Sequence, residues 1–206
     1  MIDGILDLSH HNTVDLATLA QNGILGVIHK CTQGTTLADS MFEQRKDAAS
    51  SLGMLFGSYH FGTGAASGSD QAAYFLQHAK GLLVLDFEAN TSGASMAAVQ
   101  ASAFVKAVFD ATGIYPGVYT DGSHVQALAD MPDIASNCWL WIAEYHTDAS
   151  VTSPRNAVAN TWPWSMWQWT DGSLRNHPDK YINGVDADRF NGSVDDLNAF
   201  WAKNSI

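Results

Sequence analysis

Eight short runs of apolar, β-branched and aromatic residues recur along the chain, and they constrain its fold more than any other feature. Segments with helical periodicity or loops separate them, an arrangement typical of βα units on a largely parallel sheet. Eight is also the number of strands that closes a (β/α) barrel. We therefore predict an α/β fold, an irregular (β/α)8-type barrel, with strands at residues 4–9, 26–32, 55–61, 82–88, 115–120, 139–145, 166–170 and 185–190.

Helical periodicity is clear only in the first part of the chain. Amphipathic patterns predict helices at residues 14–21, 40–52, 69–78 and 94–112, the last ending before Gly113 as helices commonly do. Between residues 139 and 190 this periodicity fades, so we expect reduced helices in the C-terminal part, with a long polar loop at residues 147–160. No repeat or linker divides the 206 residues, which predicts a single domain over residues 1–206.

The charge balance excludes two classes of partner. Ten Lys and Arg residues face 21 Asp and Glu residues, giving a net charge of −11, and basic residues do not cluster. We therefore expect no nucleic-acid binding and no attraction to anionic lipid. No apolar run is long enough to span a bilayer, and residues 1–4 carry no basic or apolar signal region. These features predict no membrane insertion and a protein made in the cytoplasm without a signal peptide, which we expect to be a monomer.

Polar residues at the ends of the predicted strands are the candidates for chemistry, because barrel active sites lie at the carboxyl ends of the strands. Asp86 and Glu88 are two residues apart on one strand, so both point to the same face, and the apolar run before them indicates the barrel interior. Close like charges keep one carboxyl protonated near neutral pH, as a general acid requires. Asp7 and Asp186, at the ends of two other strands, are expected to converge on the same mouth. The alternative for each acid is a helix cap or an ion pair.

Aromatic residues are concentrated in the C-terminal half, where six of the seven tryptophans lie between residues 139 and 169. Aromatic planes in a cleft suit the apolar faces of sugar rings, and polar neighbours such as Gln168 and Glu144 suit sugar hydroxyls. The alternative is that the tryptophans pack the barrel where helices are missing. Their positions near strand ends place Tyr119, Trp141 and Trp167 in the cleft.

Histidine and cysteine patterns do not indicate a metal site. His10 and His11 are adjacent, so on a strand they point to opposite faces, and neither H-x-H nor H-E-x-x-H occurs. Cys31 and Cys138 lack a C-x-x-C spacing and are expected to be buried hydrophobes. His60 is expected to be a hydrogen-bonded core histidine, and the alternative is a hydrogen bond to substrate from its place at a strand end. We predict no metal and no other cofactor.

Taken together, the strand ends resemble those of the glycoside hydrolase family 25 lysozymes, which are N-acetylmuramidases. Eight motifs match in order over nearly the whole chain, at residues 4–9 with 11–12, 30–35, 57–61, 85–88, 115–120, 141–145, 167–169 and 185–190. The resemblance implies an endolysin-like peptidoglycan hydrolase that cleaves the β-1,4 bond between N-acetylmuramic acid and N-acetylglucosamine.

The resemblance also implies residue roles. Glu88 would be the general acid, and Asp86 would be a nucleophile or would stabilise an intermediate formed by the substrate's acetamide. Asp7 and Asp186 would complete the acidic floor. Asp188 stands where the family usually has Asn and is the alternative to Asp186, which is favoured because it precedes Phe190 by four residues, as the family's aspartate does. The residues expected to bind substrate are Tyr59, Tyr119, Trp141, Glu144 and Gln168.

Two other functions stay open at this point. One is a sugar-binding or wall-binding barrel that has lost catalysis, and the other is a metal-dependent hydrolase acting on amides. For the leading interpretation, the partner is the glycan strand of peptidoglycan, and the protein would reach the bacterial wall, periplasmic or extracellular, through lysis or injection. The charge of −11 gives no attraction to anionic teichoic acids, which favours a thinner wall without them.

Overall fold

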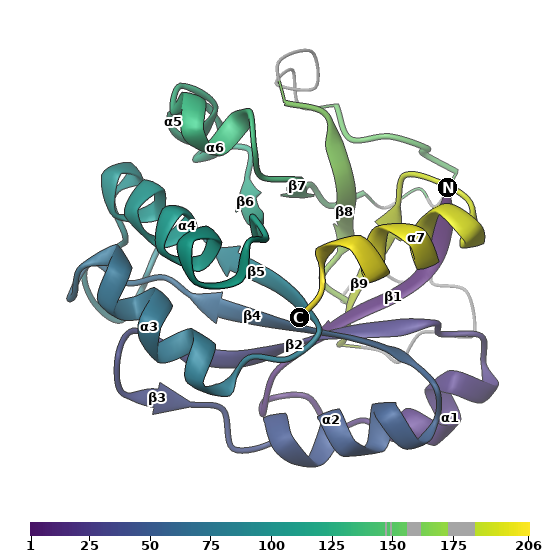
Figure 1. Ribbon diagram of the computed structural model, residues 1–206. Helices are drawn as coiled ribbons and strands as arrows, with labels where there is room; N and C mark the ends of the chain where they lie inside the picture. Colours follow the sequence, from purple (N-terminus) through teal and green to yellow (C-terminus); the bar gives the residue numbers. More distant parts are fainter. Residues whose placement is uncertain (147, 149, 156–161, 173–183) are drawn as a thin grey trace.

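A closed barrel of eight strands forms the centre of the molecule (Figure 1). The computed structural model describes residues 1–146, 148, 150–155, 162–172 and 184–206. The strands of the ring are β1 (Ile2–Leu8), β2 (Gly26–Gln33), β4 (Leu55–Phe61), β5 (Leu82–Asp86), β6 (Gly117–Asp121), β7 (Leu140–Ala143), β8 (Trp164–Thr170) and β9 (Asp186–Phe190). Their order is β1-β9-β8-β7-β6-β5-β4-β2, and pairing of β1 with β2 closes the ring. Each overlaps one of the eight predicted runs, so the predicted barrel is confirmed. A further short strand, β3 (Leu37–Ala38), was not predicted and pairs with the end of β2 outside the ring.

Strand β9 runs antiparallel to both of its neighbours, β8 and β1, whereas the other neighbouring pairs in the ring are parallel. A parallel neighbour needs a crossover from one end of the sheet to the other. Here the backbone N–H of Gly184 donates to the carbonyl of Gly172 at 3.0 Å, so the link between β8 and β9 starts and finishes at the same end. Asp186, which was predicted at the carboxyl end of the last strand, is therefore the first residue of that strand, although it still lies at the mouth.

Helices cover the first half of the barrel more fully than the second (Figure 1). Predicted helices appear as α1 (Leu16–Gln21), α2 (Phe42–Ser51), α3 (Gly68–His78) and α4 (Ala98–Thr112), and the unpredicted ones are α5 (Val125–Ala129), α6 (Pro132–Ala135) and α7 (Val194–Asn204). Helix α4 starts later than predicted because Ser95 forms a β-bridge with Thr63. It ends at Gly113, whose φ of 74° is a left-handed conformation that favours glycine.

The described residues between β7 and β9 form no helix, as expected for the C-terminal part, while residues 147, 149, 156–161 and 173–183 lie outside the description. Much of the predicted loop at 147–160 falls there. In the described part of the chain, no helix combines the length and the apolar content that a bilayer span requires.

Helix α7 closes the end of the barrel opposite the mouth. Leu197 and Trp201 on this helix are buried against the apolar side chains that fill the barrel interior. The indole Nε1 of Trp201 donates to the carbonyl of Phe56, near the start of β4, at 2.9 Å. Ser205, just after the helix, forms a β-bridge with Leu82 at the start of β5. The end of the barrel covered by α7 is therefore an apolar floor, and the polar side chains lie at the opposite end, the mouth.

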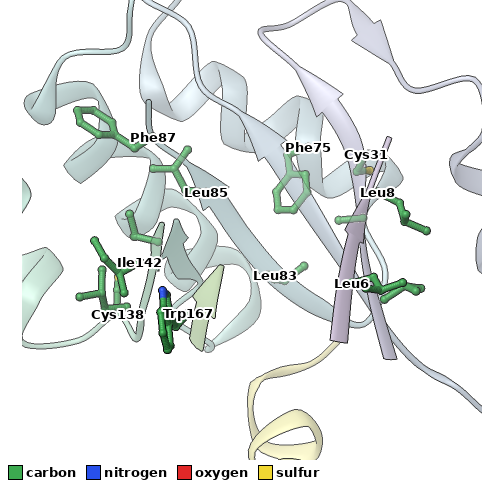
Figure 2. Packing of buried hydrophobic residues seen from close by; sticks show 14 of the residues in the cluster. Leu6, Leu8, Cys31, Phe75, Leu83, Leu85, Phe87, Cys138, Ile142 and Trp167 are labelled. Carbon is green, nitrogen blue, oxygen red and sulfur yellow. The ribbon is translucent and has the colours of Figure 1, made fainter. Parts of the chain in front are cut away.

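Alternation along the strands divides their side chains between the interior and an outer apolar layer under the helices. Figure 2 shows this outer layer, with Leu83 and Leu85 of β5 and Ile142 of β7 among its buried residues. Cys31 and Cys138 belong to it, which confirms them as buried hydrophobes. His60 is buried as well, so the prediction of a core histidine is confirmed; its Nδ1 lies 2.8 Å from the Thr32 hydroxyl.

Candidate active site

A pocket of about 180 Å³ opens at the mouth of the barrel. The first residue of β9 and residues in or just after six of the parallel strands supply its walls, so side chains far apart in the sequence meet there. Most of them are acidic or aromatic: the lining consists of Asp7, Tyr59, Asp86, Glu88, Tyr119, Trp141, Tyr145, Gln168 and Asp186. Eight of the nine residues predicted for the site are in this lining.

Asp86 and Glu88 lie together at the end of β5. Backbone bonds on both sides hold this segment: the Gly62 N–H donates to the Asp86 carbonyl, and the Phe87 N–H donates to the Tyr119 carbonyl, both at 2.9 Å. The Phe87 side chain points into the outer apolar layer, so the residues before and after it face the pocket. Asp86 is 6% exposed, whereas Glu88 is only partly buried. The two carboxyl groups therefore share the pocket at different depths.

The pKa values of both carboxyl groups are raised above their usual range. Burial, followed by the charge of Glu88, holds the pKa of Asp86 well above its usual range, and Lys30 opposes the shift. Burial and then Asp121 raise the pKa of Glu88, while Lys30 and His124 lower it. Asp86 Oδ1 is buried and has no hydrogen-bond partner among the described residues. The pair can thus offer a proton and a negative charge to the same ligand.

A hydrogen-bonded chain links the acid on β1 to the aromatic wall. Gln168 Nε2 donates to Asp7 Oδ2 at 2.8 Å, and its Oε1 accepts from the hydroxyls of Tyr119 at 2.8 Å and Tyr145 at 3.0 Å. Since an amide group donates only through its nitrogen, these bonds fix the orientation of Gln168. Burial and then Asp186 hold the pKa of Asp7 well above its usual range.

Strand β9 brings two further acids to the site at different depths. Asp186, opposite Asp7 in the β1–β9 pairing, lines the pocket, and burial and then Asp171 raise its pKa to about 6. Asp188 lies deeper and is fully buried, and its Oδ1 accepts from Trp141 Nε1 at 2.8 Å. Between the two alternatives, the structure therefore places Asp186, and not Asp188, in the pocket lining.

Glu144, which was expected to bind substrate, does not line this pocket. It follows β7 on the side opposite Trp141, and its Oε1 accepts from the Arg155 backbone N–H and lies 2.8 Å from His146 Nε2. Tyr145, which was not predicted as a site residue, takes that place in the pocket. Counting in twos from Trp141 would have identified Tyr145, because alternate residues of a strand share a face.

Trp167 also lies elsewhere than predicted. It neighbours the inward-facing Gln168, so its own side chain points outward, where it is fully buried in the outer apolar layer. Its Nε1 donates to the Glu144 carbonyl at 2.7 Å. This tryptophan packs where the described residues form no covering helix, and it does not line the pocket.

The histidines near the mouth, His10 and His11, contact other side chains of the loops around β1 and not the pocket lining. His10 Nδ1 lies 2.7 Å from Asp39 Oδ2, and the rings of His10 and His11 are 3.9 Å apart. In the described part of the chain, no group of three or more His, Cys, Asp or Glu side chains is arranged to hold a metal ion.

Comparisons with known proteins agree with this geometry. Residues 6–176 match the family model described as "Glycosyl hydrolases family 25". An N,O-diacetylmuramidase from Chalaropsis sp is 29% identical over 210 residues, with 92% of this chain and 93% of the relative covered. A muramidase structure from Acremonium alcalophilum has 30% identity and a TM-score of 0.78, covering 97% of this chain and 98% of its own. A bacterial lysozyme structure from Streptomyces coelicolor has 26% identity and a TM-score of 0.80, covering 97% and 96%. The resemblance seen in the motifs is thereby confirmed, and the chain belongs to glycosyl hydrolases family 25.

Proposed function

We propose that this glycoside hydrolase is a lysozyme that hydrolyses peptidoglycan at the β-1,4 bond between N-acetylmuramic acid and N-acetylglucosamine. The observation that carries the proposal is the pair Asp86 and Glu88 in one pocket of a family 25 barrel. The muramidase and lysozyme names of similar proteins over nearly their full length support the same reaction.

Glu88 is the proton donor in this proposal. Its carboxyl is the less buried of the pair and has a raised pKa, which keeps the acid form available at the pocket surface. It protonates the glycosidic oxygen as the bond to the anomeric carbon breaks. Water then adds its hydroxyl to the anomeric carbon, and the proton released in that step restores Glu88.

Asp86 supplies negative charge beneath the reacting sugar. It lies deeper than Glu88, and its pKa is raised by burial and by the charge of Glu88 and lowered by Lys30. When Glu88 holds its proton, the charge that opposes ionisation of Asp86 is gone. In the transition state, positive charge develops on the ring, and a buried carboxylate stabilises it strongly because the surroundings exclude water. Asp86 acts there as a nucleophile or as a partner of the substrate's own acetamide. Asp7 and Asp186 make up the rest of the acidic floor.

The aromatic wall is proposed to bind the glycan strand. Tyr59, Tyr119 and Trp141 present rings and hydroxyls in the pocket lining, and Gln168 fixes the Tyr119 hydroxyl through its amide oxygen. Rings of this kind pack on the apolar faces of sugars.

We propose further that residues 1–206 act as one catalytic domain and as a monomer, reaching the wall by lysis or injection. Gel filtration and fractionation of intact producing cells test these points, and accumulation outside unlysed cells without a secretion partner contradicts the last one.

The test of the reaction is product analysis on purified peptidoglycan. Wild-type protein, Glu88→Gln and the exposed control Glu43→Gln are incubated with wall, and borohydride labels the new reducing ends before mass spectrometry. We expect labelled muramic acid with wild type and control and none with Glu88→Gln. Labelled glucosamine would refute the bond assignment. Wall that stays intact while binding the wild-type protein would instead support a non-catalytic barrel.

A further inference from the structure

Two buried carboxyl groups meet behind the pocket wall, on the neighbouring antiparallel strands β1 and β9. Asp7 is 7% exposed and lines the pocket, whereas Asp188 is fully buried behind it. The strand pairing places Asp188 opposite Ile5, two residues from Asp7, and the two carboxyl groups lie close enough for each to shift the pKa of the other. The proposed reaction does not use Asp188.

The hydrogen-bond donors around the two carboxyl groups decide whether both groups can be ionised. Asp7 Oδ2 accepts from Gln168 Nε2 and Asp188 Oδ1 accepts from Trp141 Nε1, both at 2.8 Å. Asp188 Oδ2 is buried and meets no N–H or O–H donor among the described residues. Ionised carboxylates only accept hydrogen bonds, so two ionised groups could not bond to each other. One proton between them satisfies both groups and removes one buried charge.

The deeper residue is the better place for that proton. Desolvation penalises the charged form more strongly as burial increases, and Asp188 is fully buried while Asp7 reaches the pocket. Among the described residues, the titratable groups that act most on Asp188 are Asp7 on β1 and Asp186 on β9, and both are acidic. On β7, Trp141 stays neutral. Burial, followed by Asp7, holds the pKa of Asp188 well above its usual range.

We propose that Asp188 is a protonated positioning residue, whose carboxylic acid donates to Asp7 while accepting from Trp141 and so fixes both on the pocket wall. The proposal builds on the proposed function, because Asp7 and Trp141 are assigned there to the site. An asparagine at this position would keep one donor and one acceptor without a titratable proton. A leucine of similar size would keep neither.

Stability as a function of pH tests the proton without relying on activity. In unfolded wild type, Asp188 ionises near the ordinary pKa of about 4, but in the folded chain it keeps its proton. Wild type therefore loses stability relative to Asp188→Asn as pH rises. We expect the ratio of their unfolding constants in urea to change tenfold per pH unit between about pH 5 and 7. Parallel pH profiles would overturn the proposal, because they mean that Asp188 ionises alike in both states.

Carbon-13 NMR of labelled aspartate carboxyls locates the proton. The Asp188 resonance is the one missing from the spectrum of Asp188→Asn, and we expect it at the position of a protonated acid at pH 7. A resonance at the ionised position would refute the assignment to Asp188. This readout also separates the proposal from the proposed function, since it gives the same answer whether or not the protein cleaves wall.

Activity then tests the positioning role. We expect Asp188→Asn to keep kcat on peptidoglycan within about twofold of wild type and to stay active at higher pH. Asp188→Leu should lower kcat at least tenfold with little change in KM, because Asp7 and Trp141 lose their shared partner while the pocket keeps its rings. If Asp188→Asn and Asp188→Leu were equally active, or lost activity equally, the hydrogen bond donated by the side chain at position 188 would have no role in positioning Asp7.

Discussion

Replacing Gln168 with leucine isolates the hydrogen-bonded chain that joins Asp7 to the aromatic wall. Three bonds are lost, from Nε2 to Asp7 and from the hydroxyls of Tyr119 and Tyr145 to Oε1. Tyr145 is 48% exposed, so water replaces its partner and its bond contributes almost nothing. Tyr119 and Asp7 are 8% and 7% exposed and lose bonds worth about 1 and about 2 kcal/mol. The second bond is the stronger because the proposed proton on Asp188 leaves Asp7 ionised.

The predicted loss is therefore about 3 kcal/mol, which for a chain of this size lowers Tm by about 6–12 °C. Urea and thermal unfolding at pH 7 measure it. The matched control is Gln126→Leu, whose side chain is exposed and bonds only to the Asp130 carboxylate at 2.8 Å, so we expect a change within about 0.5 kcal/mol. A Gln168→Leu loss no larger than the control's would refute the reasoning.

Gln168→Glu adds a test by pH. This side chain has nearly the same shape, but at pH 7 it can donate to Asp7 only by holding a proton that the unfolded chain has released. On acidification the unfolded chain takes up that proton as well, so the deficit relative to wild type should shrink. A deficit that stays constant from pH 7 to pH 4 would show that the bond to Asp7 contributes little.

Three further predictions concern the barrel floor, the mouth and metal dependence. Trp201→Ala removes a buried side chain from the floor and its bond to Phe56, so urea unfolding should show a loss of about 3–5 kcal/mol; a loss below 1 would contradict that packing. Asp186 has its pKa raised to about 6, so its proton favours the folded state and the associated stability is lost as pH rises from about 4 to 6; Asp186→Asn should gain thermal stability over wild type above pH 6 and match it near pH 3, whereas a constant difference would refute the shift. EDTA should leave wall hydrolysis unchanged, since the described residues include no cluster of His, Cys, Asp or Glu side chains suited to a metal; inhibition reversed by added zinc would support the metal-dependent alternative.

Local periodicity was enough to predict most of the pocket. Asp86 and Glu88 share a face because they are two residues apart at a strand end, and the same rule brings Trp141 and Tyr145 together. Glu144 lies between the positions of this alternation, so its side chain faces away from the pocket that Trp141 and Tyr145 line. Trp167 follows the same rule, since its neighbour Gln168 faces inward.

The direction of β9 and the position of α7 lay beyond such rules. An alternating strand has the same pattern in either direction, so nothing within residues 185–190 shows that Asp186 enters at the mouth. That depends on whether the preceding link crosses the barrel. Helix α7 has a local signal, Ser193 bonded reciprocally with Asp196 in a capping box. Its place on the barrel floor, however, depends on contacts with strands more than 100 residues earlier, such as the bond from Trp201 to Phe56.

The role of Glu88 as proton donor is tested most directly by varying the leaving group. Wild type and Glu88→Gln are compared on peptidoglycan and on an aryl glycoside of the same sugar, whose acidic phenol leaves without protonation. We predict a loss of about 100- to 10,000-fold for Glu88→Gln on peptidoglycan and of about tenfold or less on the aryl glycoside. An equal loss on both substrates would show that Glu88 does not donate the proton to the leaving oxygen.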